Sequence, residues 1–172
     1  IDATTGVTSG ANIAITDGDI YYANAKINEY TVTYDYATNG GTAASKTSDK
    51  VAIGSSIDLT PSATKAGYTF VGWNTDKDAK VGLTELTMGK ADVTVYAIYK
   101  KDCTVTYHTY DDELNYTDHV TLYNNDTSKT LDLLSYDIDT NTYKFIGYSD
   151  NRESTNILEN SSIEVNDNID LY

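Results

Sequence analysis

The side chains best able to do chemistry in this 172-residue chain are its single cysteine and two histidines. Cys103 and His108 lie five positions apart in a stretch of alternating residue types. Because successive side chains of a strand point to opposite faces, an odd separation keeps this thiol and imidazole apart. His119 precedes Val120 with the opposite parity, so we expect it to face solvent. The sequence therefore predicts no catalytic residue, and we interpret Cys103 as an incidental thiol.

One acidic segment has the spacing of a calcium-binding loop. Asp137, Asp139 and Asn141 match the first three ligand positions of such a loop. The sixth position would be Thr142, where glycine is needed, and the twelfth would be Tyr148, where a bidentate glutamate is needed. A lone cysteine also excludes an internal disulfide and a cysteine-based zinc site. We predict no metal and no cofactor, although weak calcium association at the acidic groups stays open.

The charge and hydropathy of the chain exclude two classes of partner. With 26 acidic and 12 basic residues the net charge is −14, so the surface would repel nucleic-acid phosphates. The longest apolar runs are about five residues, as at 95–99, which is too short to insert in a membrane. Residues 1–102 have net charge −3 and residues 103–172 have net charge −11. This asymmetry fits either mutual repulsion on a crowded surface or a basic partner that docks on the second half.

An internal repeat organises the rest of the sequence. Three landmark pairs occur in the same order: Val32 with Val105, Phe70 with Phe145, and Tyr96 with Tyr172. Their separations are 73, 75 and 76 residues, too long for a solenoid repeat of about 20 to 50 residues. We predict two tandem modules, 29–101 and 102–172. Residues 1–28 are expected to be the tail of a preceding repeat or an N-terminal strand or linker.

Each module is predicted to be mostly strand. In the first module Val32, Tyr34 and Tyr36 alternate with polar residues, which indicates a half-buried strand. Further strands are expected at 50–53, 57–59, 68–74 and 92–100. Pro61 and Gly67 could begin and end one or two helical turns at 62–66.

The most specific of these predicted strands carries two aromatic residues. In the strand at 68–74, simple alternation places Phe70 and Trp73 on opposite faces. Because the second copy keeps Phe145 but has Tyr148 in place of Trp73, we interpret Phe70 as the more demanding core position.

Four spaced motifs of the first module resemble the Listeria-Bacteroides repeat, also called the internalin B-repeat. They are Tyr-Thr-Val-Thr-Tyr-Asp at 30–35, Asn-Gly-Gly at 39–41, Gly-Tyr-Thr-Phe-Val-Gly-Trp at 67–73 and Val-Tyr-Ala at 95–97. The second module keeps the positions Val105, Tyr107, Tyr143, Phe145, Gly147 and Tyr172. It lacks the Asn-Gly-Gly turn and has Tyr148 where the family usually has tryptophan, so it resembles a divergent copy.

The resemblance implies a fold and a role. It implies an α+β, mostly β fold: tandem small β-grasp modules, related in shape to ubiquitin-like proteins, with short helical turns. Such repeats occur in multi-domain proteins exposed on bacterial surfaces, as stalk, spacer or adhesive modules without catalysis. We therefore expect a non-enzymatic, extracellular, cell-surface or cell-wall-associated repeat region.

An alternative role is that of a glycan- or protein-binding module in a larger secreted protein. Tyr110, Tyr116 and Tyr123 have no counterpart in the first copy, and exposed tyrosines offer rigid contact area with a polar tip. They are our candidate ligand contacts, with ordinary β-surface positions as the alternative. The partners expected are an unidentified surface protein or glycan and neighbouring repeats of the same chain.

Overall fold

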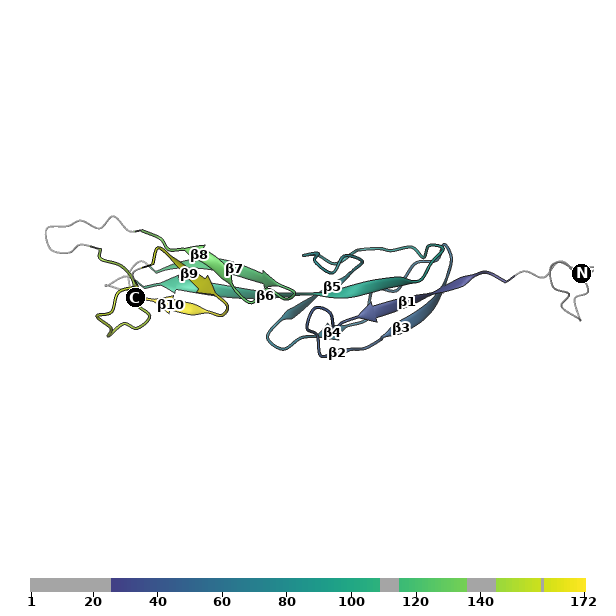
Figure 1. Ribbon diagram of the computed structural model, residues 1–172, viewed down its shortest axis with the longest axis horizontal. Helices are drawn as coiled ribbons and strands as arrows, with labels where there is room; N and C mark the ends of the chain where they lie inside the picture. Colours follow the sequence, from purple (N-terminus) through teal and green to yellow (C-terminus); the bar gives the residue numbers. More distant parts are fainter. Residues whose placement is uncertain (1–25, 109–114, 136–144, 159) are drawn as a thin grey trace, which may run out of the picture.

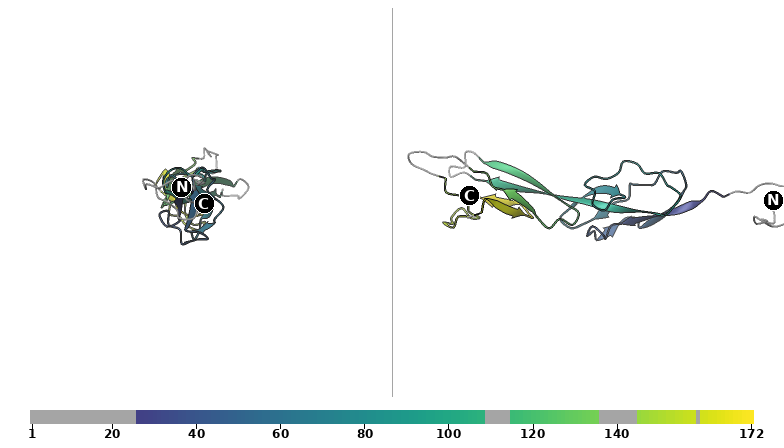
Figure 2. Two further views of the ribbon diagram at one scale, coloured as in Figure 1. Left: turned by 90° about the vertical axis from the view of Figure 1, so that its right-hand side faces the viewer. Right: turned by 45° about the horizontal axis from the view of Figure 1, so that its top comes forward.

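A computed structural model describes residues 26–108, 115–135, 145–158 and 160–172. Two bodies lie end to end along one long axis, and strand β6 (Val93–Tyr107) passes through both (Figure 1). The view along that axis shows a narrow cross-section (Figure 2). The described part of the chain is therefore elongated, with its C-terminus at the tip of one body.

The N-terminal body is a mixed sheet completed by a small strand pair. Its strands are β1 (Glu29–Asp35), β2 (Ala43–Ala44), β3 (Ser48–Ala52), β4 (Ala63–Thr64), β5 (Thr69–Asn74) and the first part of β6. β1 pairs with β3 in antiparallel and with β6 in parallel orientation. β5 pairs antiparallel with the other edge of β6, and β2 pairs with β4. The first and last strands of this body are thus parallel neighbours.

The C-terminal body is built around the second part of β6. Its other strands are β7 (Tyr116–Tyr123), β8 (Lys129–Asp132), β9 (Ser162–Val165) and β10 (Ile169–Leu171). β7 pairs antiparallel with β6, whereas β10 runs parallel to it. β8 and β9 form a separate antiparallel pair.

One strand joins the two bodies without a break. Lys100 pairs with Thr69 of β5 on one edge of β6 and with Tyr123 of β7 on the other. The module boundary expected between 101 and 102 therefore lies inside β6. Residues 1–25, most of the expected N-terminal tail, lie outside the described residues.

Each body has its own buried core, as alternating strand residues require. The core of the N-terminal body contains Val32, Tyr34, Val51, Ile57, Ala63, Trp73, Met88, Val95, Ala97 and Tyr99. The core of the C-terminal body contains Cys103, Val105, Tyr107, Val120, Leu122, Tyr148, Val165 and Leu171. The partly buried Tyr68 packs against both cores, so the two cores meet beside β6.

The expected opposition of Phe70 and Trp73 is wrong. The pairing of β5 with β6 shifts register between Phe70 and Gly72, which marks a β-bulge. Gly72 has φ +146°, a conformation that favours glycine. The extra residue reverses the alternation, so the two rings meet edge to face with centroids 5.5 Å apart. Trp73 is fully buried whereas Phe70 is only partly buried, so the tryptophan is the more demanding core position.

The expected α component is also wrong: the described residues contain no helix, and the fold is all-β. Instead of a helical turn at 62–66, Ala63 and Thr64 pair with β2. The amide of Ser45 donates to the carbonyl of Ser62 (2.8 Å), and the buried indole nitrogen of Trp73 donates to the carbonyl of Pro61 (2.7 Å). These bonds hold the segment extended, because its polar groups find partners across the fold.

The expected strand at 57–59 is not formed either. Ile57 is buried, and its amide donates to the carbonyl of Leu86 (2.8 Å) beside an isolated bridge between Ser56 and Thr87. A β-grasp fold with helical turns is therefore not what these residues adopt.

Candidate functional site at the junction of the two bodies

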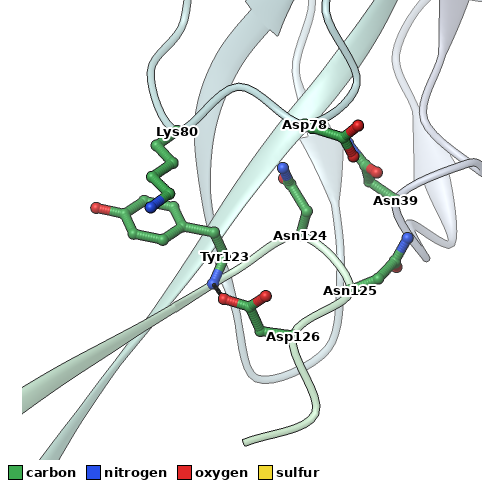
Figure 3. Close-up of a pocket in the computed structure, with 7 residues that line it drawn as sticks. All are labelled: Asn39, Asp78, Lys80, Tyr123, Asn124, Asn125 and Asp126. Carbon is green, nitrogen blue, oxygen red and sulfur yellow. Dashed lines mark hydrogen bonds between the residues drawn. The ribbon is translucent and has the colours of Figure 1, made fainter. Parts of the chain in front are cut away.

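A group of hydrogen bonds joins the two bodies where they meet beside β6. The turn that follows β7 belongs to the C-terminal body and reaches the loop around residues 77–79 of the N-terminal body (Figure 3). Its first residue, Asn124, has φ +48° and is buried. Asparagine tolerates this left-handed conformation better than most residues, which suits it to this turn.

Asn124 is bonded to the N-terminal body through both its backbone and its side chain. Its amide donates to the Tyr99 carbonyl (3.0 Å), and its Oδ1 accepts from the Tyr99 amide (3.1 Å). Its Nδ2 donates to the carbonyls of Lys77 (3.1 Å) and Ala79 (2.9 Å). Its own carbonyl accepts from the ammonium of Lys65. Asn124 therefore acts as a latch between the two bodies.

The Asn-Gly-Gly turn at 39–41 bonds to the same loop of the N-terminal body that receives Asn124. Nδ2 of the buried Asn39 donates to the carbonyls of Lys77 and Ala97, both at 2.9 Å. Asn39 thus shares the Lys77 carbonyl with the latch residue and fixes the receiving loop on β6. A Cβ atom at Gly41 would overlap the hydroxyl of Tyr99, which explains the second glycine of the motif.

Further contacts across the junction come from the rest of the turn. Nδ2 of Asn125 donates to the Thr38 carbonyl (3.0 Å), and the hydroxyl of Tyr68 donates to the Asp126 carbonyl (3.3 Å). The ammonium of Lys65 lies 4.0 Å from the centre of the Tyr68 ring, a cation–π contact. Burial lowers the pKa of Lys65, and the charge of Asp126 opposes that shift. The cation is thus held between the Asn124 carbonyl and the face of the Tyr68 ring.

A shallow hollow of about 260 Å³ opens at this junction (Figure 3). It is lined by Asn39, Asp78, Lys80, Tyr123, Asn124, Asn125 and Asp126. The Lys80 ammonium lies 5.6 Å from the centre of the Tyr123 ring, and an Asp126 carboxylate oxygen accepts from the Tyr123 amide (2.9 Å). The three asparagine side chains bond to the chain itself. These contacts hold the junction together.

The candidate tyrosines are not gathered in one place. Tyr110 lies outside the described residues. Tyr116 is 48% exposed and its ring centre is 6.1 Å from that of Tyr107, whereas Tyr123 lines the junction hollow. They occupy opposite ends of the eight-residue strand β7, roughly 23 Å apart at the usual rise of a strand. One small ligand cannot contact both, and their role in binding stays a prediction.

The structure separates the residues considered for catalysis. Cys103 is fully buried in the core of the C-terminal body, and His119 is exposed, as expected. His108 lies beyond the end of β6, with Nε2 2.9 Å from a carboxylate oxygen of Asp170. Its ring stacks on Tyr172, with centroids 4.6 Å apart.

The segment considered for calcium lies mostly outside the described residues. This applies to Asp137, Asp139, Asn141 and Thr142, whereas Tyr148 is buried in the core of the C-terminal body. Elsewhere in the described part of the chain, no three histidine, cysteine or carboxylate side chains gather to hold a metal. The same residues include no helix long and apolar enough to span a bilayer.

Sequence reasoning missed the latch. The run Tyr-Asn-Asn-Asp at 123–126 ends an alternating segment with residues that tolerate positive φ, so a turn could have been predicted there. Its partners at 77–79 and 99 could not, because nothing local links them to Asn124.

Comparison with known proteins identifies part of the chain. No curated protein and no solved structure matches it. Residues 30–98 match the Listeria-Bacteroides repeat domain, a family usually non-catalytic and typical of bacterial surface proteins. The match extends from Tyr30 in β1 to Ile98 in β6, and it includes the Asn-Gly-Gly turn and the buried tryptophan. The N-terminal body of this chain is therefore a Listeria-Bacteroides repeat domain.

Proposed function

We propose that this chain is a stalk or spacer segment of a bacterial cell-surface or secreted protein. The observation that carries the proposal is the junction, where an unbroken β6 and the latch residue Asn124 hold two bodies in line. A spacer must keep its length, and a strand shared by two sheets leaves no flexible linker at which the bodies could fold back.

We further propose that residues 102–172 are a second, divergent copy of the repeat. Strand register supports this: Val32 pairs with Val93 in the N-terminal body, and Val105 pairs with Ile169 in the C-terminal body. These positions correspond at the separations of 73 and 76 residues seen in the sequence.

The aromatic residues support the same relationship. Trp73 lies 5.2 Å from Tyr34 and 5.5 Å from Phe70, between ring centroids. Tyr148 lies 5.1 Å from both Tyr107 and Phe145. Each body thus packs three aromatic rings around the same repeated positions, and the tyrosine replaces the tryptophan at the centre.

The finer fold proposal is that each module keeps the strand arrangement of a β-grasp sheet without its helix. In the N-terminal body the parallel pair of β1 and β6 lies at the centre, with antiparallel β3 and β5 outside it. In the C-terminal body, β6 and β10 form the parallel pair and β7 lies outside β6.

Small-angle X-ray scattering of the whole chain tests the spacer role. We expect a rod-like profile in which both bodies share one axis. The matched control carries a flexible Gly-Ser linker inserted between Lys101 and Asp102, inside β6, and we expect it to have a broader distribution of dimensions. Indistinguishable profiles would show that the junction is not rigid and would contradict the proposal.

The second candidate function is adhesion through a glycan or protein ligand. The exposed ring of Tyr116 favours it, since such rings suit sugar and protein contacts. A glycan array probed with the whole chain separates the two roles. A pure spacer binds no glycan, whereas binding that disappears in Tyr116→Ala but not in Glu85→Ala would support adhesion.

A further inference from the structure

We infer that the fold is built to bear tension along its length, with β6 as the load-bearing strand. The inference deepens the proposed stalk role and rests on it. β1 and β10 both run parallel to β6 and pair with different parts of it. A force applied at the start of β1 and at the end of β10 therefore passes from β1 to β6 and from β6 to β10.

The first transfer of force occurs between β1 and β6. Residues Val32–Asp35 lie in register with Val93–Tyr96. Because the strands are parallel, pulling β1 from its start and β6 from its far end slides one along the other. The evenly spaced hydrogen bonds of a parallel pair are then loaded together. An antiparallel pair pulled from two adjacent ends opens one bond at a time.

The second transfer of force has the same geometry in the C-terminal body. Ile169–Leu171 lie in register with Val105–Tyr107. Beyond this pair, the His108 amide donates to the Leu171 carbonyl (2.7 Å), and Ser149 and Tyr172 exchange two backbone hydrogen bonds (2.8 and 3.0 Å). The β6–β10 pair is thus held by three paired residues together with these additional backbone hydrogen bonds.

A side chain strengthens the start of each parallel pair. Oδ1 of Asp92, which precedes β6, accepts from the Thr31 amide of β1 at 2.6 Å. Oδ1 of Asn168, which precedes β10, accepts from the Thr104 amide of β6 at 2.9 Å. In each body, the bond joins the first strand of the parallel pair to the residue just before the second strand. The two bodies therefore close their force-bearing pairs in the same way.

The path of force also avoids the rest of the chain. The chain between Tyr36 and Asp92 connects β1 to β6 and carries no load while these strands stay paired. When the pair separates, this stretch can extend to roughly 200 Å, the length of a fully extended chain with this number of residues.

Single-molecule force spectroscopy on the whole chain tests the inference by changing only the direction of pulling. In one version, handles are attached through Asn28→Cys and a cysteine added after Tyr172. In the other, they are attached through Asn28→Cys and Ser55→Cys, both exposed, so that β1 and β3 are peeled apart from adjacent ends. Cys103 is fully buried and should take no handle, which the unaltered chain checks.

We expect the rupture force for end-to-end pulling to exceed that for peeling by more than about twofold, because several hydrogen bonds share the load. Equal or lower force in the end-to-end direction would overturn the inference, whereas a rod-like scattering profile would still support the spacer role.

Two side-chain variants provide an independent test. In end-to-end pulling, Asp92→Ala should lower the force of one of two unfolding events, and Asn168→Ala should lower the other. Glu85→Ala, an exposed position outside both pairs, should change neither. Circular dichroism checks that each variant stays folded. If the Asp92 and Asn168 variants of the folded chain rupture at the forces of the parent, these bonds carry no load and the inference is wrong.

Discussion

Replacing Asn124 should destabilise the body to which it does not belong. Asn124 follows β7 of the C-terminal body, yet its side chain bonds to Tyr99, Lys77 and Ala79 of the N-terminal body. Each of these three hydrogen bonds contributes about 1 kcal/mol net. Asn124→Gly, which accepts φ +48° without strain, should therefore cost about 3 kcal/mol. Asn124→Ala should cost about 1 kcal/mol more, because alanine is strained at that φ.

The assay is urea unfolding of the whole chain, followed by tryptophan fluorescence. Trp73 is the only tryptophan and lies in the core of the N-terminal body, so its signal reports on the body across the junction. Asn125→Ala is the matched control, because it loses a single bond at an exposed position and should cost less than about 1 kcal/mol.

From the geometry of the latch we expect Asn124→Ala to lose the most stability, Asn124→Gly to lose less, and the control Asn125→Ala to lose the least. A Trp73 transition in Asn124→Gly that lies within about 0.5 kcal/mol of the parent would refute the reasoning. It would mean that the two bodies are adjacent without being coupled.

Three further predictions concern the N-terminal body. Trp73→Ala should cost about 3 to 5 kcal/mol and Phe70→Ala clearly less, because only Trp73 is fully buried; urea melts that give the reverse order would contradict the observed core. Gly41→Ala should cost about 1 to 3 kcal/mol, since its Cβ would overlap the Tyr99 hydroxyl; thermal melts should show no comparable loss for Gly89→Ala, where nothing lies nearby. Burial raises the pKa of Tyr99 to about 12 from an ordinary value of 10, so the stability that its neutral form contributes is complete below pH 10 and is lost as the pH rises through about 12. Unfolding measured from pH 8 to 12 should show this fall, and Tyr99→Phe should make it smaller without removing it, because burial also raises the pKa of Tyr34 and Tyr107.

Sequence alone found the parts of this protein that rest on local patterns. Alternation located β1, because a strand with one buried face must alternate, and the strand predicted at 68–74 contains the whole of β5. The repeated landmarks led to the proposal of a second copy, which the parallel pairings of Val32 with Val93 and of Val105 with Ile169 support. The four motifs at 30–35, 39–41, 67–73 and 95–97 indicated the family that matches residues 30–98.

The tertiary structure decided what depends on distant partners. A single bulge at Gly72 reversed the predicted faces of Phe70 and Trp73, because alternation holds only while pairing stays in register. Pro61 and Gly67 are typical of the start and end of a short helix. The polar groups of this segment pair instead with residues 42–45 and with Trp73, and those bonds outweigh a weak local preference for helix.

The junction is the clearest case of the same physical rule. Asn124 is marked in the sequence only as a turn residue, whereas its role follows from carbonyl and amide groups 25 to 47 positions away. Likewise, no local signal distinguishes two strands joined by a linker from one strand shared by two sheets. Hydrogen bonds and packing between distant segments decide that distinction, and here they make β6 continuous.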